Sequence, residues 1–447
     1  MAVITAENAS GRVVSMRRER WAWYLYDFGN SAYAAVVLLA IYSAYFKGTV
    51  VGGAEGSRLW GYAIGIAMLV VAVISPILGA IADHTGSKKR FLFFFTTLSC
   101  IFTATLFFVQ RGDIALGMIL LIVAEIGYRS AQVFYNALLP EIAGPKEVAR
   151  VSGIGWAIGS AGGILCLLLI LPAIIFVRGA LVVRLSLVFT ALFFAVSAVP
   201  IFFWLKERAP RRALPAGQGY LQVAFGRLGH TIRTAANYRE FIKFMISFLI
   251  YNDGVIMALD FAAIMGAVLF GLDEQLLILF VILVQVTNVI GAYLFGLLAE
   301  RVGCKQGLMA SILAMIAGVV WLFFAHGVVQ FFVIGAVAGA AMAGIQSLSR
   351  TMAGVMAPAG RRAEFFGFFA VAGRTSSFIG PAVYGLLAAE AARWLENRGL
   401  AVRAAEQMGQ RIAILSIGVF LLVGSIMLLF VNERHARGIA QMETENR

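Results

Sequence analysis

Long apolar runs separated by short polar segments make up most of the chain. About twelve of these runs reach the roughly 20 residues that an α-helix needs to cross the hydrocarbon core of a bilayer. They predict helices at 22–46, 58–82, 91–110, 114–138, 150–176, 181–205, 241–270, 274–299, 306–326, 329–353, 364–391 and 410–432. A backbone in lipid must satisfy its own hydrogen bonds, and the sequence lacks the alternating ten-residue segments of a membrane barrel. The pattern predicts an all-α membrane protein with twelve transmembrane helices in two six-helix bundles.

The polar segments set the expected boundaries. We expect a cytoplasmic tail at 1–20, an N-terminal bundle at 21–205, a basic cytoplasmic connector at 206–239, a C-terminal bundle at 240–432 and a second cytoplasmic tail at 433–447. In proteins built from two such halves, the substrate site lies near the bilayer midplane and access to it alternates. Alternating access is therefore the working hypothesis.

Composition and charge agree with a membrane protein. The chain is 61% hydrophobic and 13% charged, whereas soluble domains are about 45–50% apolar and about 25% charged. The formal net charge is +13, and most of the 36 lysines and arginines fall in segments that the topology places inside. This asymmetry predicts that both termini are cytoplasmic and that the inner face meets anionic lipid. It requires no nucleic acid partner.

Cysteine and histidine usage argues against metal or cofactor chemistry. Cys100, Cys166 and Cys304 are scattered along the chain, and none of the four histidines lies in the middle of an apolar run. We therefore expect no disulfide framework, no metal site and no cofactor. The first apolar run is long, carries Asp27 and lacks a small-residue cleavage site, so we interpret it as a retained helix rather than a signal peptide.

A polar loop motif occurs once in each half. The first copy reads Gly79-Ala-Ile-Ala-Asp83-His-Thr-Gly86-Ser-Lys88-Lys89-Arg90, and the second reads Gly296-Leu-Leu-Ala-Glu300-Arg301-Val-Gly303-Cys-Lys305. The first glycine of each copy is expected to let two helices approach closely, and the second glycine to allow a tight turn. The acids and the cations are expected to reach a neighbouring helix end or lipid headgroups. We expect these residues to act in gating.

The doubled motif resembles the loop signature of the major facilitator superfamily, and the resemblance covers nearly the whole chain. It implies the two-bundle fold described above. The alternative is an unrelated polytopic protein with a basic inner loop.

Polar groups inside the predicted helices are the candidate site residues, because ionisable groups in a bilayer cost about 2.5–3.5 kcal/mol each on insertion scales. In the first helix, Asp27 and Asn30 are three residues apart and share a face, and Tyr33 follows one turn later. An acid beside an amide can bind a cation, accept a proton or hold a substrate ammonium. Alternatively, Asp27 tethers a neighbouring helix near the cytoplasmic end.

The fourth helix carries Glu125 and Arg129, which are spaced i, i+4 with the acid first, the favourable order for an ion pair. Gln132 and Asn136 follow on the same helix. Arg129 would anchor a carboxylate, or Glu125 would carry a proton. The alternative is a static pair.

The second half offers a comparable set. Its polar candidates are Asn252, Asp253 and Asp260 in the seventh helix and Arg374 in the eleventh. Arg374 has no partner on its own helix, so an aspartate or a substrate carboxylate would have to compensate its charge. The remaining polar candidates are Trp156, Gln285, Asn288 and Gln346. Gln285 and Asn288 share a face and would line a cavity or join two helices by hydrogen bonds.

Several further stretches carry a narrower resemblance. They are Tyr26-Asp27-Phe28-Gly29-Asn30-Ser31-Ala32-Tyr33, Asn252-Asp253-Gly254, Gln346-Ser347-Leu348-Ser349-Arg350, Glu364-Phe365-Phe366-Gly367-Phe368 and Gly380-Pro381. As a set they are similar to the vacuole-effluxer, autophagy-related branch of the superfamily and its bacterial relatives. The resemblance implies amino-acid efflux. The short connector is similar to the bacterial form, which favours a bacterial-type cell membrane over a vacuolar one.

Together these features predict a monomeric secondary transporter that moves a small polar solute, an amino acid or related zwitterion, by proton symport or antiport. One alternative is an exporter of amphipathic drugs or lipids. Another is a non-transporting sensor or assembly factor on the same fold. An enzyme is not expected, because no nucleophile, base and orienting residue occur together and no nucleotide motif is present.

Overall fold

A computed structural model describes residues 2–143, 147–177, 179–208, 238–356 and 378–433, together with residues 369, 373 and 435. Nearly all of these residues are helical, and no β-strand occurs among them. Eleven helices in this part of the chain are long and apolar enough to cross a membrane. The predicted all-α membrane class is confirmed.

The chain packs into two compact units. The first consists of Met1–Leu38, Ile77–Val109 and Ile119–Ala224, and the second consists of Leu39–Pro76, Gln110–Met118 and Phe225–Arg447. The chain passes between them inside helical segments after Leu38, after Pro76 and after Met118. The expected bundle boundaries at 21–205 and 240–432 remain predictions.

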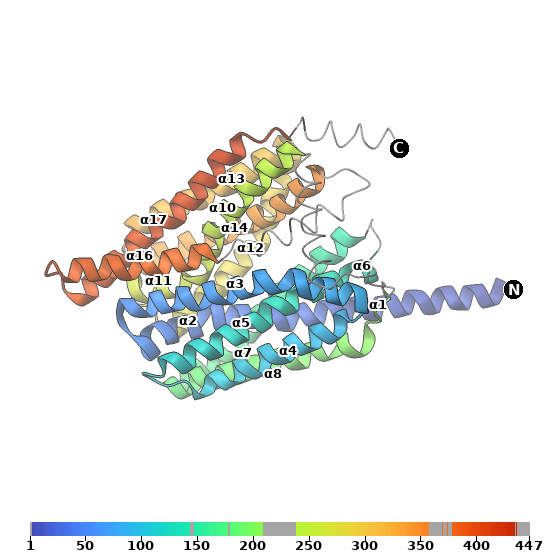
Figure 1. Cartoon of the computed structure of the whole chain (residues 1–447), viewed down its shortest axis with the longest axis horizontal. Coiled ribbons are helices and arrows are strands. Elements are labelled where there is room, and N and C mark those ends of the chain that lie inside the picture. The colour runs from blue at the N-terminus through green and yellow to red at the C-terminus, as the bar shows by residue number, and fades with distance from the viewer. Residues whose placement is uncertain are drawn as a thin grey trace, which may run out of the picture. The chain divides into compact units, whose positions relative to one another are not determined.

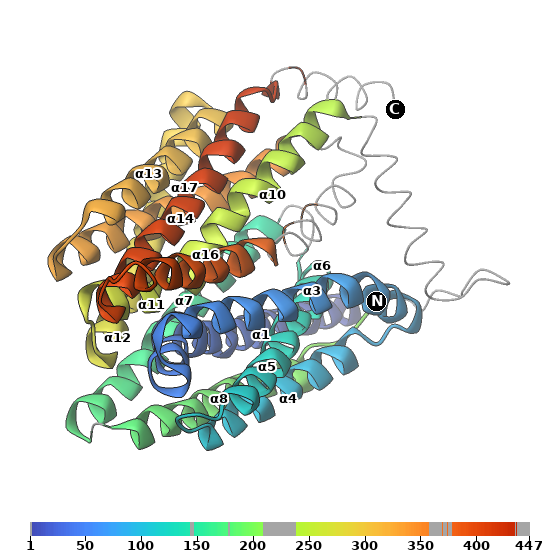
Figure 2. The same cartoon turned by 60° about the vertical axis from the view of Figure 1, so that its left-hand side comes forward.

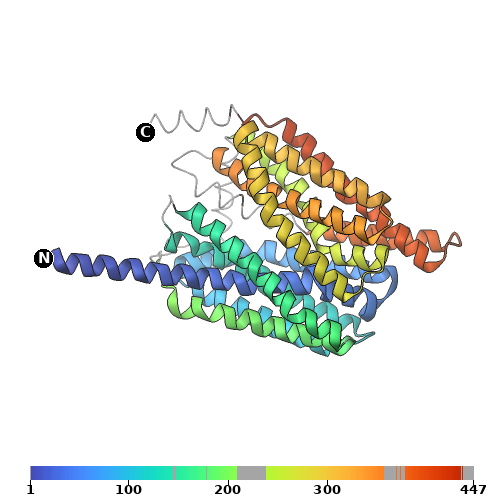
Figure 3. The same cartoon turned by 180° about the vertical axis from the view of Figure 1, so that it is seen from behind.

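The first unit is built from five long helices and several shorter pieces. Its elements are α1 (Ala2–Tyr33), the C-terminal end of α3 (Gly53–Thr85), α4 (Lys88–Thr105), a short 3₁₀ turn (Leu106–Phe108), most of α5 (Ile114–Ala137), α6 (Leu139–Ile142), α7 (Val148–Phe176) and α8 (Ala180–Trp204). Helix α4 lies beside α8, and α1 packs against both α7 and α8 (Figure 1). At its N-terminal end α1 extends past the other helices of this unit (Figure 3).

The second unit is built from the rest of the helices. Its elements are α2 (Tyr42–Tyr45), most of α3, α10 (Arg239–Asp260), α11 (Ala262–Phe270), α12 (Glu274–Val302), α13 (Cys304–Phe324), α14 (Val328–Met356), α16 (Ile379–Glu396) and α17 (Val402–Leu429). Helix α10 lies beside α17 (Figure 2), and α16 also packs on α17. Helix α16 occupies the second part of the predicted 364–391 helix, whose first part lies largely outside the described residues.

Two predicted helices are interrupted. The first apolar run leaves α-helical geometry after Tyr33 and continues as π-helix at Ala34–Ala40 and again at Phe46–Val51. The run predicted at 241–270 is broken at Phe261, between α10 and α11. Hydropathy alone misses both interruptions, because a π turn or a one-residue break leaves the apolar pattern unchanged. Such irregularities in membrane helices are frequent at functional sites.

Candidate functional site

Helix α5 carries a buried ion pair inside the first unit. The Nε of Arg129 donates to Glu125 Oε1 at 2.6 Å, which confirms the predicted i, i+4 pairing. The Glu125 side chain is 0% exposed, and its second oxygen, Oε2, makes no hydrogen bond. The Arg129 guanidinium also lies 5.3 Å from the centre of the Tyr128 ring. The pair is neutral as a whole, but one carboxylate oxygen is left for a further partner.

Tyr33 of α1 lies beside the pair of Glu125 and Arg129. Its ring stacks on Tyr128 with centroids 4.4 Å apart, and its side chain lies close to Glu125 and Arg129. The Tyr33 hydroxyl is buried and, like Glu125 Oε2, is without a hydrogen bond of good geometry. Two buried polar atoms therefore lie near each other, both with capacity to bind a small polar group.

Asp27 and Asn30 continue this face of α1 toward the helix N-terminus. Their side chains interact, as the three-residue spacing predicts. The Asn30 side chain is 2% exposed, and its Oδ1 has no hydrogen-bond partner. Gly159 of α7 faces Asp27 so closely that a Cβ there would lie 2.5 Å from Oδ2. Asp27 thus packs against α7, which also fits the alternative interpretation of a helix tether.

Aromatic side chains line the contact between α1 and α5. Trp23 and Tyr26 of α1 both stack on Tyr135 of α5, with centroids 4.3 and 4.9 Å apart. The indole N–H of Trp23 donates to the Tyr135 carbonyl at 3.0 Å. Sequence reasoning missed Tyr128. The signal that was available is the spacing of seven residues between Tyr128 and Tyr135, which places both rings on one face of α5.

The three other candidates in the first unit have different surroundings. Asn136 is exposed, and its amide donates to the Gln132 carbonyl of its own helix at 2.7 Å. The Gln132 side chain interacts with Tyr128 and is half-buried. Trp156 of α7 is 48% exposed. Gln132 is linked to the pair through Tyr128, whose ring lies beside the Arg129 guanidinium.

The second unit has its own buried polar group on α10. Asp253 is 3% exposed; it accepts a hydrogen bond from the Gly380 backbone N–H, and its Oδ1 has no partner. Asn252 is 4% exposed and donates to the Gly373 carbonyl at 3.3 Å. Asp260, two turns further on, is 2% exposed, and its carbonyl accepts from the Trp60 indole at 2.8 Å.

The other second-half candidates separate into two kinds. Asn288 of α12 donates to the Gly339 carbonyl of α14 at 3.3 Å, which is a bond between helices. Gln285 Nε2 is buried without a hydrogen-bond partner. Gln346 is half-buried on α14. Arg374 lies outside the described residues.

The two loop motifs are partly as predicted. Gly86 and Gly303 have φ values of 59° and 102°, so both turns use the left-handed region that favours glycine. The close approach expected at Gly79 and Gly296 is not seen among the described residues. A Cβ at either position would meet no atom of the described chain within 4 Å, so close helix packing at these glycines stays a prediction.

The charged residues of the motifs have different surroundings. Lys88 pairs with Glu141 at 3.0 Å, and Lys305 donates to two carbonyls at the end of α17. Arg90, Glu300 and Arg301 are exposed. The side chain of Asp83 lies outside the described part of the structure.

Solved structures with the same fold are transporters. One is a bacterial homologue of the human lysosomal transporter Spinster in an inward-facing, occupied conformation, with a TM-score of 0.70, 14% identity, and coverage of 94% of this chain and 96% of that chain. Another is the nucleoside transporter NupG, with a TM-score of 0.66, 14% identity, and coverage of 92% of this chain and 98% of that chain. Together with the helical architecture, these likenesses show that the chain has the same fold as these transporters.

The particular family is also defined. The family described as "Vacuole effluxer Atg22 like" matches residues 57–441, and the chain belongs to it. Among curated proteins, the chain is 27% identical to an uncharacterized MFS-type transporter, YxiO of Bacillus subtilis, over 95% of this chain and 97% of that protein. It is 21% identical to autophagy-related protein 22-1 of Penicillium rubens over 77% of this chain and 72% of that protein. The chain is thus a multi-pass membrane transporter, and its family comprises transporters rather than enzymes.

Proposed function

We propose that this transporter moves a small zwitterion, an amino acid or a related compound, by alternating access coupled to protons. The observation that carries the proposal is the buried pair of Glu125 and Arg129 beside Tyr33. Charges inside membrane helices are costly and normally face a pathway or a partner. A pair that is neutral at rest inserts at lower cost, and it still presents each charge to a ligand that competes for it.

The geometry suggests a role for each member. A substrate carboxylate would compete with Glu125 for the Arg129 guanidinium, which binds carboxylates well because its donors form a planar fork. Protonation of Glu125 would weaken its hold on Arg129 and favour that exchange. This links proton binding to substrate binding through one hydrogen bond of 2.6 Å. The substrate ammonium would be held by an aspartate, for which Asp27 in the same unit is the first candidate.

Polar atoms without partners favour a polar solute over an amphipathic one. Asn30 Oδ1 and Asp253 Oδ1 are buried and lack hydrogen-bond partners, and the buried Tyr33 hydroxyl lies close to Glu125 without a hydrogen bond of good geometry. The rings of Tyr33 and Tyr128 stack on each other, so one face of each ring is already covered. These positions offer hydrogen bonds rather than apolar surface.

Membership of a family named for a vacuole effluxer supports transport of a solute across a membrane. For this chain we propose a cell membrane of bacterial type, with both termini cytoplasmic and a monomeric protein. The distribution of basic residues supports the orientation. Anionic lipids would contact the cytoplasmic face.

Counterflow in proteoliposomes tests whether the protein transports amino acids. Purified protein is reconstituted, vesicles are loaded with a pooled amino-acid mixture, and uptake of labelled amino acids is measured. We expect uptake that Arg129→Gln abolishes and that Arg403→Gln, a change at an exposed arginine of α17, leaves unchanged. If no amino acid moves while an amphipathic dye does, the zwitterion proposal fails and the exporter hypothesis replaces it.

Glu125→Gln tests proton coupling separately. The amide keeps the shape of the carboxylate but cannot exchange a proton, so exchange of substrate down its own gradient should continue. Accumulation driven by a proton gradient should be lost. If the variant still concentrates substrate when a proton gradient is imposed, Glu125 is not the coupling site, and Asp253→Asn becomes the next variant to measure.

A further inference from the structure

The turn between α16 and α17 is an exposed tip of the second unit. Helix α16 ends at Glu396 and α17 begins at Val402, and every residue from Asn397 to Ala404 is exposed. The turn extends past the other helices of this unit (Figure 1). The chain reverses at Gly399, whose φ of 91° lies in the region that favours glycine. The turn is therefore an open surface that no other described helix of the unit covers.

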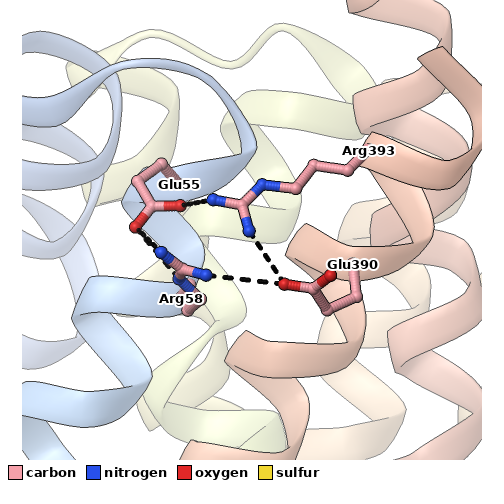
Figure 4. A network of polar contacts seen from close by, with 4 residues as sticks. All are labelled: Glu55, Arg58, Glu390 and Arg393. Atoms are coloured by element: carbon pink, nitrogen blue, oxygen red, sulfur yellow. Dashed lines mark hydrogen bonds and ion pairs between the residues drawn. The ribbon is translucent and has the colours of Figure 1, made fainter. Parts of the chain in front are cut away.

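Ion pairs hold the base of this turn against α3 (Figure 4). Arg393 of α16 pairs with Glu55 of α3 at 2.6 Å, and Arg58 of α3 pairs with Glu390 of α16 at 3.4 Å. Arg393 also pairs with Glu390 on its own helix, at 2.9 Å. The end of α16 is thus fixed, and the charge of Arg393 is compensated within the unit.

Further toward the tip, Arg398 stacks on Trp394 of α16. Its Cζ lies 3.7 Å from the centre of the indole ring. At this separation the planar guanidinium lies flat on the ring, because an edge-on approach would push its nitrogens into the ring atoms. The stack fixes the guanidinium but leaves the N–H donors at its edge, which suit a pair of phosphate oxygens. Arg398 makes no ion pair among the described residues, so its charge is available to an outside anion.

The exposed side of α16 changes character toward the turn. Leu387 and Trp394 are two helical turns apart and lie on one face, and they are 37% and 52% exposed. Arg398 follows four residues after Trp394. An exposed aliphatic residue, then a tryptophan and then an arginine is the order expected where hydrocarbon gives way to headgroups. We therefore expect the stack of Trp394 and Arg398 at headgroup depth.

Helix α17 places the turn at the same depth. Its C-terminal end is marked by Lys305, whose ammonium donates to the Leu429 carbonyl at 2.9 Å and has to lie near water or headgroups. Roughly 20 residues of helix cross the hydrocarbon, so counting back from Leu429 reaches the other boundary near Gln410. The first two turns of α17 and the exposed turn before them therefore lie outside the hydrocarbon.

The turn also combines exposed apolar groups with net positive charge. Leu400 and Val402 are 41% and 63% exposed. Within residues 394–404, Arg398 and Arg403 outweigh the one acid, Glu396. Apolar side chains beside cations are typical of a segment that rests on a membrane surface and is attracted by anionic lipid. Charge complementarity therefore favours an anionic phospholipid as the occupant.

We propose that the turn between α16 and α17 is a binding site for an anionic phospholipid. The Arg398 guanidinium binds the lipid phosphate through its N–H donors, and Trp394 fixes that guanidinium at headgroup depth. Leu400 and Val402 contact the upper part of the acyl chains. In the proposed orientation the lipid belongs to the non-cytoplasmic leaflet. The site involves no transported substrate, so its failure and the failure of the proposed function are distinguishable.

Quenching of a fluorophore by labelled lipid tests the site in the full chain. A bimane group is attached through Ala404→Cys in protein whose three native cysteines have been replaced by serine. The protein is reconstituted in phosphatidylcholine vesicles with a minor share of phosphatidylglycerol. A nitroxide quencher near the head of the acyl chain is carried either by phosphatidylglycerol or by an equal amount of phosphatidylcholine. The ratio of the two quenching efficiencies measures the local preference for the anionic lipid.

We expect this ratio to be about five in the parent, which is the fold-change that corresponds to one arginine attracted to anionic lipid. Arg398→Gln should bring the ratio close to that of a surface without preference. Arg403→Gln is the matched control, because it removes the same charge from the same turn at a side chain without an aromatic ring beside it among the described residues. It should keep most of the preference. Trp394→Leu keeps every charge and removes only the stack, and it should lower the ratio.

Equal quenching by the two lipids in the parent overturns the proposal, and so does a preference that Arg398→Gln leaves intact or that Arg403→Gln removes equally. If excess inorganic phosphate abolishes the preference, the site takes free phosphate rather than lipid, which also overturns the proposal. An unchanged ratio in Trp394→Leu would mean attraction by charge alone, and it would overturn the role of the stack.

Discussion

The two copies of the loop motif make the same contact with the end of a neighbouring helix. In the first copy, Lys89 at the start of α4 donates to the carbonyls of Phe202 and Leu205, at 2.9 and 2.6 Å. In the second copy, Lys305 at the start of α13 donates to the carbonyls of Leu429 and Val431, at 2.9 and 2.7 Å. Both lysines thus close the C-terminal end of the last helix in their half, where unpaired carbonyls favour a cation.

A glutamate completes each copy from the other side. Glu207, just after α8, accepts from the Lys88 backbone N–H at 2.7 Å. Glu433, just after α17, accepts from the Lys305 backbone N–H at 3.1 Å. Glu207 therefore caps the N-terminal end of α4, while Lys89 of α4 caps the C-terminal end of α8. In the same way, Glu433 caps the N-terminal end of α13, while Lys305 of α13 caps the C-terminal end of α17. This reciprocal capping is the contact that the two copies of the motif share.

The first copy carries an addition that the second lacks among the described residues. Lys88 pairs with Glu141 at 3.0 Å, and both side chains are nearly buried. The corresponding first residue of α13 is Cys304, whose thiol lies 3.5 Å from the Leu348 carbonyl. The comparison teaches that both copies share the reciprocal capping, whereas among the described residues only the first copy has an ion pair to a further helix, α6.

The largest effect is expected from removing the shared lysines. Lys89→Met and Lys305→Met should each lower the free energy of unfolding by about 1.5–3 kcal/mol, because each leaves two carbonyls without a charged donor. Thermal unfolding in detergent would measure this, with Lys206→Met at an exposed lysine as the control. If only one of the two lysines matters, the capping is not a shared property of the repeat.

An intermediate effect is expected at the ion pair of the first copy. A double-mutant cycle of Lys88→Ala and Glu141→Ala should give a coupling free energy of about 1 kcal/mol, since the pair is partly buried but near the membrane surface. The same unfolding assay applies to the two single variants and the double variant. If the losses of unfolding free energy in the two single variants simply add in the double variant, the ion pair contributes nothing to stability. The two copies would then differ in structure but not in stability.

The smallest effect is expected at Cys304. Cys304→Ala removes only a weak thiol donor of similar size, so the free energy of unfolding should change by less than about 0.5 kcal/mol. A loss as large as that of Lys88→Ala would show that position 304 is the energetic equivalent of position 88. That result would contradict the distinction drawn between the two loops.

Alignment of the motifs by sequence pairs Lys88 with Lys305, but the structure pairs Lys89 with Lys305. The glycines align, yet α4 begins at Lys88 and α13 begins at Cys304, one position apart in the alignment. A one-residue offset rotates a side chain by about 100° around a helix. Which lysine reaches the neighbouring helix end could therefore not be read from the motif.

Local interactions were predictable from the sequence. Hydropathy places the membrane helices because it depends only on a stretch of about 20 residues. The pair of Glu125 with Arg129 was predictable because i, i+4 neighbours on a helix meet whatever surrounds them. The positive φ of Gly86 and Gly303 follows in the same way from the demands of a tight turn.

By itself the sequence determined the all-α membrane class, the doubled loop motif and the residues that could carry charge inside a helix, because each depends on neighbours within a few turns. Only the tertiary structure decided that Tyr33 stacks on Tyr128, that Asp253 lies against Gly380, and that Glu55 meets Arg393. Those contacts join helices that are far apart in the chain. They depend on the packing and rotation of each helix, which the many apolar positions of a membrane segment do not specify on their own.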